Sequence, residues 1–236
     1  MSLVELEMVG GEAEGRVGRI FLNRPEKSNA LTSAFLDDLA SSFQDLKTSE
    51  ELRVVVLAGR GKTFCGGADI SELKTLNEKN ASAFVERIHF VCKAIRALPV
   101  PVIAQLHGAV IGGALEIAAA CDLRVAAEGT RFAMPEVKLA IPSVVEAALL
   151  PRLMGSGRAA WLVLTGEPID AKRAYEWGLV EEIGGEAAVE KLVKALVACD
   201  RRVLAMQKEL LQLWDEAPLA QSISRSLELF AQAHKK

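Results

Sequence analysis

The sequence is poor in the side chains that usually hold metals or disulfides. Among 236 residues there are only 4 cysteines and 3 histidines. The cysteines form no CxxC pair and no zinc-type spacing, which favours free thiols in the reducing cytosol. The histidines are too scattered for a metal cluster, and no HExxH motif occurs. We therefore expect no metal site, and we predict a cytoplasmic protein.

The sequence also lacks an excess of basic charge and a membrane span. The formal net charge is -3, so no overall basic field exists to hold nucleic acid. The N-terminal "MSLVELEMVG" has two Glu and no basic apolar leader, which predicts no signal peptide. The apolar run 98–115 contains two prolines, three glycines, Gln105 and His107, and these argue against a helix in lipid. With half its residues hydrophobic and a quarter charged, the chain has the composition of a packed soluble protein.

Three common catalytic or nucleotide-binding motifs fail as well. In "GRGKTF" a P-loop would need glycine at Val56, and a dinucleotide fingerprint would need glycine at Phe64. The GxSxG elbow of serine hydrolases is absent, since Met154 stands two residues before Ser156. A serine hydrolase is the least favoured reading for a further reason: no histidine follows "IPS" before His234.

What the sequence does contain is an alternation of buried strands, glycine loops and helices. This order favours an α/β fold with a largely parallel sheet, followed by a helical region from about residue 143. We assign residues 1–184 to the α/β core and residues 185–236 to a C-terminal helical region. The predicted strands are 16–23, 52–59, 101–108 and 122–127, and the predicted helices include 33–47 and 113–121.

Two loops share one design, in which glycines stand between a strand and a helix start. They read "FCGGADI" (64–70) and "AVIGGALE" (109–116). Glycine lets the backbone approach a ligand closely, and a helix start leaves free N–H groups. One N–H from each loop could therefore form an oxyanion hole. The competing interpretation is that the glycines only permit close packing of helix on sheet. In the first loop, Asp69 can cap a helix, with Glu72 in capping-box register.

Two carboxylates accompany the second loop. Glu116 is the single charge within the small and apolar run 107–121, one helical turn after the double glycine. Glu136 directly follows Pro135 and a short apolar strand. Two carboxylates beside an oxyanion hole can divide acid and base work between them. Taken by itself, Glu136 is equally well explained as a solvated loop residue.

These motifs together resemble the crotonase, or enoyl-CoA hydratase/isomerase, superfamily. The resemblance runs from about residue 16 to 183. It is carried by "LNRPEKSNAL", "GKTFCGGADI", "PVIAQLHGAVIGGALEIAAACDLRVAAE", "FAMPEVKLAIP" and "LTGEPIDAKRAYEWGLV". It implies a crotonase-like ββα spiral core, with C-terminal helices at subunit contacts or covering the acyl pocket.

The resemblance also implies roles for individual residues. Ala68 and Gly113 match the two backbone donors of the oxyanion hole, and Glu116 and Glu136 match the catalytic glutamates of hydratases. No separate cofactor is implied, because coenzyme A enters as part of an acyl-CoA thioester substrate. A homotrimer or a dimer of trimers is expected. The residues that match segments lining the coenzyme A site, or that could contact its phosphates, are Arg24, Lys27, Ala30, Lys62, Ala68, Asp69, Ile70 and Gly112.

The segment after Glu136 departs from the family pattern. Many hydratases carry a glycine-rich turn there, whereas this chain reads "IPSVVEAALLPRL". Ser143 and Glu146 then predict a capping box that opens a helix to Leu153. The bulkier residues put the water step in question, so an isomerase of 3-enoyl-CoA that uses Glu136 alone is the main alternative to a hydratase. Thioester hydrolysis, decarboxylation and a non-catalytic scaffold that binds coenzyme A or RNA also stay open.

Overall fold

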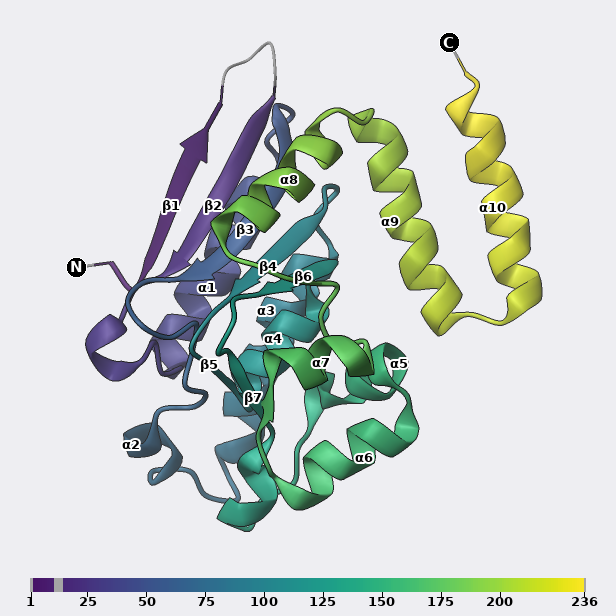
Figure 1. Ribbon diagram of the computed structural model, residues 1–236. Helices are drawn as coiled ribbons and strands as arrows, with labels where there is room; N and C mark the ends of the chain where they lie inside the picture. The colour runs from purple at the N-terminus through teal and green to yellow at the C-terminus, as the bar shows by residue number, and fades with distance from the viewer. Residues whose placement is uncertain (1, 11–14, 236) are drawn as a thin grey trace.

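The main sheet of the molecule is formed from six strands in the order β1-β2-β3-β4-β6-β9 (Figure 1). The computed structural model describes residues 2–10 and 15–235. β1 pairs with β2 in antiparallel register, and the remaining neighbours are parallel. The strands are β1 (Val4–Val9), β2 (Arg16–Leu22), β3 (Leu52–Gly59), β4 (Val102–Leu106), β6 (Leu123–Ala126) and β9 (Glu182–Ile183).

Both faces of this sheet are covered, which explains the near-continuous apolar run of β3. Val55 and Leu57 point into the larger cluster, with the helices α1 (Ser33–Leu46), α3 (Ala81–Arg96) and α4 (Gly113–Ala120). Val54 and Val56 point to the opposite side, where α8 (Glu186–Val197) packs. The first helix of the region 185–236 thus closes the sheet. The boundary between residues 184 and 185 stays a prediction.

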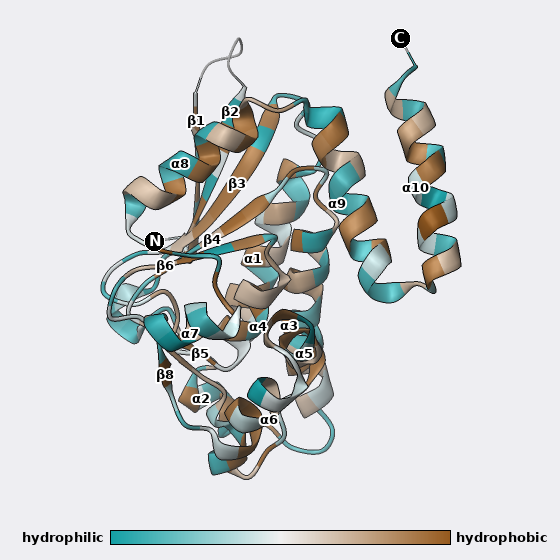
Figure 2. Ribbon diagram, turned by 45° about the vertical axis from the view of Figure 1, so that its right-hand side comes forward, coloured by the Kyte–Doolittle hydropathy of each residue, from teal (hydrophilic) through white to brown (hydrophobic). Residues whose placement is uncertain are grey.

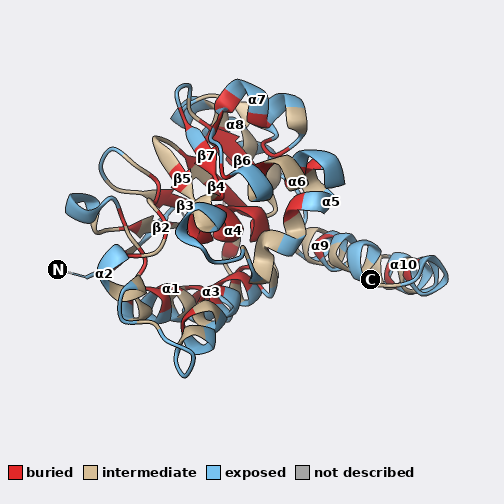
Figure 3. Ribbon diagram, turned by 90° about the horizontal axis from the view of Figure 1, so that it is seen from below, coloured by how far each residue is buried: buried red, intermediate tan, exposed pale blue. Residues whose placement is uncertain are grey.

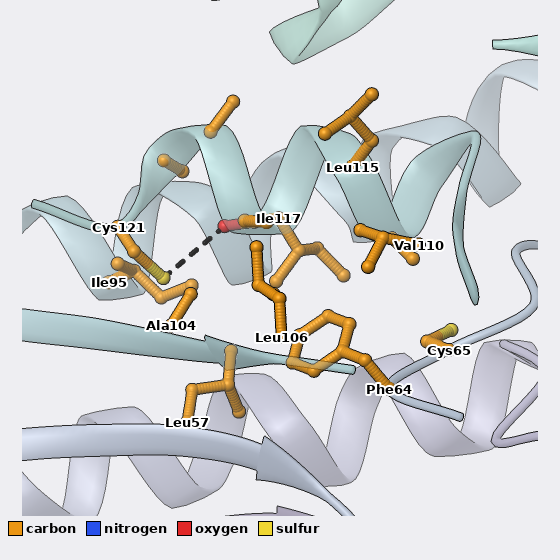
Figure 4. Close-up of a cluster of buried hydrophobic side chains, with 14 of the residues drawn as sticks. Leu57, Phe64, Cys65, Ile95, Ala104, Leu106, Val110, Leu115, Ile117 and Cys121 are labelled. Carbon is orange, nitrogen blue, oxygen red and sulfur yellow. Dashed lines mark hydrogen bonds between the residues drawn. The ribbon is translucent and has the colours of Figure 1, made fainter. Parts of the chain in front are cut away.

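Helix α4 is buried along its whole length. Its side chains Ile117 and Cys121 lie over Leu106 and Ala104 of β4 (Figure 4). The Cys121 thiol, Sγ, donates to the Ile117 carbonyl at 3.5 Å. The opposite side of α4 packs against α3 and the 3-10 helix η3 (Val145–Leu149). A charged residue on this helix is therefore enclosed from all sides.

A second, smaller sheet stands beside the start of α4. Its strands are β5 (Ala109–Ile111), β7 (Arg131–Ala133) and β8 (Ile169–Asp170), in the order β5-β7-β8. The short elements around it are the 3-10 helices η1 (Pro25–Lys27) and η2 (Pro135–Leu139) and the helices α2 (Ile70–Leu73), α5 (Leu150–Met154), α6 (Ser156–Thr165) and α7 (Ala171–Trp177). Trp161 of α6 and Trp177 of α7 meet edge to face, with ring centroids 5.4 Å apart.

The last two helices stand out from the body as a hairpin (Figures 1 and 3). They are α9 (Arg201–Glu216) and α10 (Leu219–Ala233). Lys208 anchors α9, since its buried ammonium lies 2.7 Å from the Asp122 carboxylate. The same ammonium donates to the carbonyls of Ile95 and Val100 at 3.1 and 3.0 Å. A buried charge with this many partners fixes the base of the hairpin to the core.

Hydrophobic residues recur along both helices of the hairpin (Figure 2), and several large apolar side chains there are open to water. They are Val203, Leu211 and Trp214 on α9 and Leu219, Ile223, Leu227 and Phe230 on α10. We call these seven residues the hairpin apolar face. A group of exposed apolar side chains of this size is typical of a protein contact. None of the helices within residues 2–10 and 15–235 is long and apolar enough to cross a membrane.

The predicted α/β class and the predicted strands are confirmed, whereas the predicted helix 143–153 is wrong. Val144 is extended there, with φ -134° and ψ -166°, and a 3-10 turn precedes α5. No side chain caps η3, because Ser143 and Glu146 bond elsewhere. Asp69 does cap α2 by accepting from the Ser71 N–H at 2.8 Å. Glu72 is not its capping-box partner, since it accepts from the Ser33 N–H at 2.9 Å.

Candidate active site

The two glycine loops lie side by side. Cys65 and Val110 form a parallel bridge between them. Gly67 has φ +91°, and a Cβ at that position would lie 2.8 Å from the Ile111 carbonyl oxygen. Only glycine therefore permits this approach of one loop to the other. As a result, Ala68 and the start of α4 are brought to the same place.

The two predicted oxyanion donors, the N–H groups of Ala68 and Gly113, make no backbone hydrogen bond among the residues that the structure describes. The bridge between Leu31 and Ala68 employs the Leu31 N–H and the Asp69 N–H, so it leaves the Ala68 N–H free. Gly113 is the first residue of α4, and its N–H likewise has no backbone acceptor within the described ranges. A helix start adds partial positive charge at this point. Two free donors thus stand where the loops meet.

Glu116 is buried in the first turn of α4, with only 3% of its surface exposed. Its pKa is raised from 4.5 to about 8, mainly by burial and in addition by the negative charges of Glu136 and Glu146. The backbone N–H groups of Ala147 and Val144 act in the opposite direction. The proton affinity of Glu116 is therefore suited to taking up and releasing a proton near neutral pH.

Glu136 approaches the start of α4 from η2. A Cβ at Gly112 would overlap the Oε1 atom of Glu136, and Gly112 itself has φ +56°. The Ser143 hydroxyl donates to the Oε2 atom at 3.1 Å. Burial raises the pKa of Glu136, while its own backbone N–H and Ser143 oppose the rise. Both predicted glutamates are thus brought to the α4 start beside the free N–H groups.

A third carboxylate, Glu146, belongs to the same cluster, and sequence reasoning missed it. Its Oε1 lies 2.7 Å from the Nδ1 atom of His89, and its buried Oε2 has no hydrogen-bond partner. The sequence feature that could have pointed to Glu146 is its position in the segment after Glu136, which departs from the family pattern. No group of His, Cys, Asp and Glu side chains in the described part of the chain is arranged to hold a metal ion.

A cavity of about 700 Å³ opens next to Ala68. Six of the eight residues predicted to bind coenzyme A line this cavity. Lys62 is exposed and is not among the lining residues, and Gly112 lies next to Glu136. The lining residues are Arg24, Lys27, Ser28, Ala30, Thr32, Gly66, Ala68, Asp69, Ile70, Ser71, Glu72 and Thr75. Contact with a phosphate stays a prediction for all of these residues.

Arg24 has a partner inside the protein. Its guanidinium binds the Asp69 carboxylate at 2.6 Å and the Ala30 carbonyl at 3.1 Å. The hydrogen bond from Arg24 is the main cause that holds the pKa of Asp69 below its ordinary value. This pair ties the wall of the cavity to the residue that follows Ala68. Arg24 therefore positions the loop, whatever it contacts in a ligand.

Asn29 is a second organising residue that the sequence did not single out. It is fully buried, and its Oδ1 accepts from the Arg24 N–H at 2.8 Å. Its Nδ2 donates to the carbonyls of Thr63 and Phe64 at 2.8 and 3.0 Å. A buried amide with these partners pins the loop that carries Arg24 to the loop that leads to Ala68.

Comparison with known proteins identifies the family. Residues 12–236 match the model of a family described as enoyl-CoA hydratase/isomerase. The short-chain-enoyl-CoA hydratase of Clostridium acetobutylicum is 38% identical over 182 residues, covering 76% of this chain and 70% of that protein. YngF of Bacillus subtilis, which carries the name enoyl-CoA hydratase/isomerase, is 42% identical over 166 residues. That alignment covers 70% of this chain and 64% of YngF, so the chain spans about two thirds of these relatives.

Solved structures share the whole fold. The enoyl-CoA hydratase of Bacillus anthracis superposes with a TM-score of 0.93 at 30% identity, covering 100% of this chain and 92% of that one. The Mycobacterium smegmatis enoyl-CoA hydratase gives 0.92 at 31% identity, with 99% and 91% covered. With the family match, these likenesses confirm the crotonase-like core and the C-terminal helical region. The chain therefore belongs to the enoyl-CoA hydratase/isomerase family of the crotonase superfamily.

Proposed function

We propose that this protein is an enoyl-CoA hydratase, which adds water across the C2–C3 double bond of a 2-enoyl-CoA thioester. The observation that carries the proposal is the α4 start, where two free backbone N–H groups stand beside two buried or half-buried glutamates. The cavity next to Ala68 supports a coenzyme A moiety that reaches the site from the outside.

In this mechanism the N–H groups of Ala68 and Gly113 hold the thioester oxygen. They stabilise the negative charge that this oxygen gains when C3 is attacked. Oxyanion donors contribute about 3–4 kcal/mol each in enzymes where one has been removed. Neither group has to break a backbone hydrogen bond to act, so the donors are already organised for the enolate.

The two glutamates then divide the proton transfers. Glu116 takes a proton from water as the water oxygen attacks C3. Glu136 gives a proton to C2 as the enolate collapses. The buried position of Glu116 makes it a stronger base than an exposed glutamate, because burial raises its pKa. The Ser143 hydroxyl supports Glu136 by holding its Oε2 atom.

The test is the ultraviolet absorbance of crotonyl-CoA mixed with the purified protein. Hydration removes the conjugated double bond, so the absorbance falls with the wild type. We expect kcat to drop by roughly 10²–10⁴-fold in Glu116→Gln and in Glu136→Gln, the range typical of a lost acid or base. Glu86→Gln, on the exposed side of α3, is the matched control with wild-type kcat. A double variant of Glu116 and Glu136 with an unchanged rate would contradict this mechanism.

The same experiment separates hydration from isomerisation. An isomerase would move a proton between C2 and C4 with Glu136 alone and would need no water. It would leave crotonyl-CoA unchanged, convert a 3-enoyl-CoA, and keep its activity in Glu116→Gln. Thioester hydrolysis would release free coenzyme A thiol, which a thiol reagent detects. We favour hydration because Glu116 is also held at the site.

We also propose that the chain works as a homotrimer or a dimer of trimers in the cytoplasm. The hairpin apolar face supports association, since seven large apolar side chains on α9 and α10 are open to water in the single chain. Burying such side chains contributes about 25 cal/mol for each Å² removed from water. The composition and the four cysteines without a CxxC pair support a reducing compartment.

A further inference from the structure

Glu146 is the side chain of the site that the two-glutamate mechanism leaves without a role. Its side chain is 11% exposed. One oxygen, Oε1, contacts the His89 ring nitrogen, and the enclosed Oε2 has no partner among the described residues. A buried polar atom without a partner costs about 1–3 kcal/mol, and more when it carries charge. A feature with this cost calls for a function in the reaction.

Glu146 stands against Glu116. It belongs to η3, which packs on α4 and on α3. Across this packing contact, the charge of Glu146 is one of the causes that raise the pKa of Glu116, whereas the backbone of its neighbours Val144 and Ala147 lowers it. From α3, the buried thiol of Cys92 faces both acids. From η2, the charge of Glu136 acts on Glu116 as well.

Exposure to water increases along this row of side chains. Glu116 is 3% exposed, the Glu146 side chain 11% and the His89 side chain 48%. Cys92 offers no alternative path, since burial raises the pKa of its thiol well above the ordinary value and keeps it neutral. Imidazole is the usual proton shuttle near neutral pH. The row therefore leads from the enclosed base to the solvent.

The chemistry of hydration creates a need for such a path. Each turnover leaves Glu116 with a proton from water and Glu136 without the proton that it gave to C2. Glu136 is half-buried and can regain its proton from solvent. Glu116 is enclosed, so its extra proton has to leave through a neighbouring group before the next water can be activated.

Resting on the hydratase function proposed above, we propose that Glu146 and His89 form a proton relay that returns Glu116 to its ionised state after each turnover. The O–H bond of protonated Glu116 breaks, and the proton binds the Oε2 atom of ionised Glu146. After rotation of that carboxyl group about its Cγ–Cδ bond and a turn of the exposed His89 ring, the proton passes to the ring nitrogen that carries no hydrogen. The imidazolium then loses the proton of its other ring nitrogen to water, and a turn of the ring in the next cycle presents that vacated nitrogen to Glu146. The reverse order serves dehydration.

The experiment follows crotonyl-CoA hydration by His89→Ala in dilute buffer, both at steady state and in a single turnover with enzyme in excess. We expect kcat to fall at least tenfold and KM to fall in proportion, while kcat/KM and the single-turnover rate stay within twofold, because the relay acts after the chemistry. Added imidazole should restore kcat. His234→Ala, at the end of α10, is the matched control, and imidazole should leave its kcat unchanged.

Glu146→Gln tests the order of the relay. It should lose kcat to a similar extent, but imidazole should not restore it, because the carboxylate between Glu116 and the solvent is gone. An unchanged kcat in His89→Ala overturns the relay. So does an equal loss in the single turnover, or a loss that imidazole leaves in place. A wild type that does not hydrate crotonyl-CoA overturns the hydratase function itself, which is a separate result.

Discussion

At the scale of the residue, one buried acid links the stability of the protein to its chemistry. Burial raises the pKa of Glu116 to about 8 from 4.5. The folded protein thus holds this proton more tightly than the unfolded chain does. The stabilising contribution is fully present below pH 4.5 and is lost as the pH rises through about 8. Ionising Glu116 for catalysis therefore works against the folded state.

Replacing Glu116 by Gln should remove this cost. We expect Glu116→Gln to melt close to the wild type at pH 5 and above it at pH 9, since the amide cannot ionise. Each kcal/mol corresponds to roughly 2–4 °C for a chain of this size. Thermal unfolding followed by circular dichroism at both pH values is the measurement. A wild type whose melting temperature equals that of the variant at pH 9 would contradict the prediction.

Ser143 should adjust the pKa of Glu136, the proposed catalytic acid, without being required for its action. Its hydroxyl donates to Glu136 and favours the charged form, so its bond lowers the pKa of that glutamate. In Ser143→Ala, the pKa of Glu136 should rise, and the alkaline limb of kcat/KM against pH should move to higher pH. Ser42→Ala, which removes a hydroxyl from the exposed side of α1, should leave the profile unchanged. A shift of the limb to lower pH would refute this role.

At the scale of the element, the start of α4 fixes the distance between catalytic groups. Gly112 precedes the helix with φ +56°, and a Cβ there would push against the Glu136 carboxylate. A side chain at that position would also cost about 1–3 kcal/mol in backbone strain, because φ +56° with ψ -125° is a conformation that glycine alone adopts readily. The glycine therefore serves the site in two separable ways, through its backbone angle and through the space that it leaves.

The substitution Gly112→Ala should displace Glu136 and lower kcat by at least tenfold. Gly129→Ala is the matched control, because Gly129 has φ +82° but nothing within 4 Å of the added Cβ. Both variants should lose stability through backbone strain, and only the first should lose activity. Urea unfolding measures the loss of stability, and the crotonyl-CoA assay measures the loss of activity. Equal activity loss in both variants would mean that strain alone is responsible.

Comparing the predicted helices and strands with those of the structure shows which features the local sequence can predict. The strand β2 alternates in polarity, β3 and β4 are apolar runs, and the helix α4 begins at the second glycine of its pair, so their positions were predicted correctly. Residues 143–149 were predicted wrongly as the start of an α-helix. The Ser and Glu spacing fits a cap, but both side chains bond across the fold to Glu136 and His89 instead. Partners that lie 7 and 57 residues away along the chain leave no local signal.

At the scale of the whole molecule, the hairpin of α9 and α10 should carry the association of subunits. Leu227 is an exposed member of the hairpin apolar face. We expect Leu227→Glu to shift the assembly toward smaller species in analytical ultracentrifugation, because a charge would be buried in the contact. Ser224→Glu adds the same charge to α10 and should keep the wild-type mass. A monomeric wild type would contradict the prediction.

The three tryptophans divide between the two parts of the molecule. Trp161 and Trp177 touch each other in the body, whereas Trp214 lies on α9 with half of its surface exposed. An indole that leaves water emits at shorter wavelength. In Trp161→Phe/Trp177→Phe, the remaining fluorescence should come from the hairpin alone. The wavelength of its emission maximum then reports whether the hairpin is in contact with another subunit. It can be followed without any label, at the enzyme concentrations used in an assay.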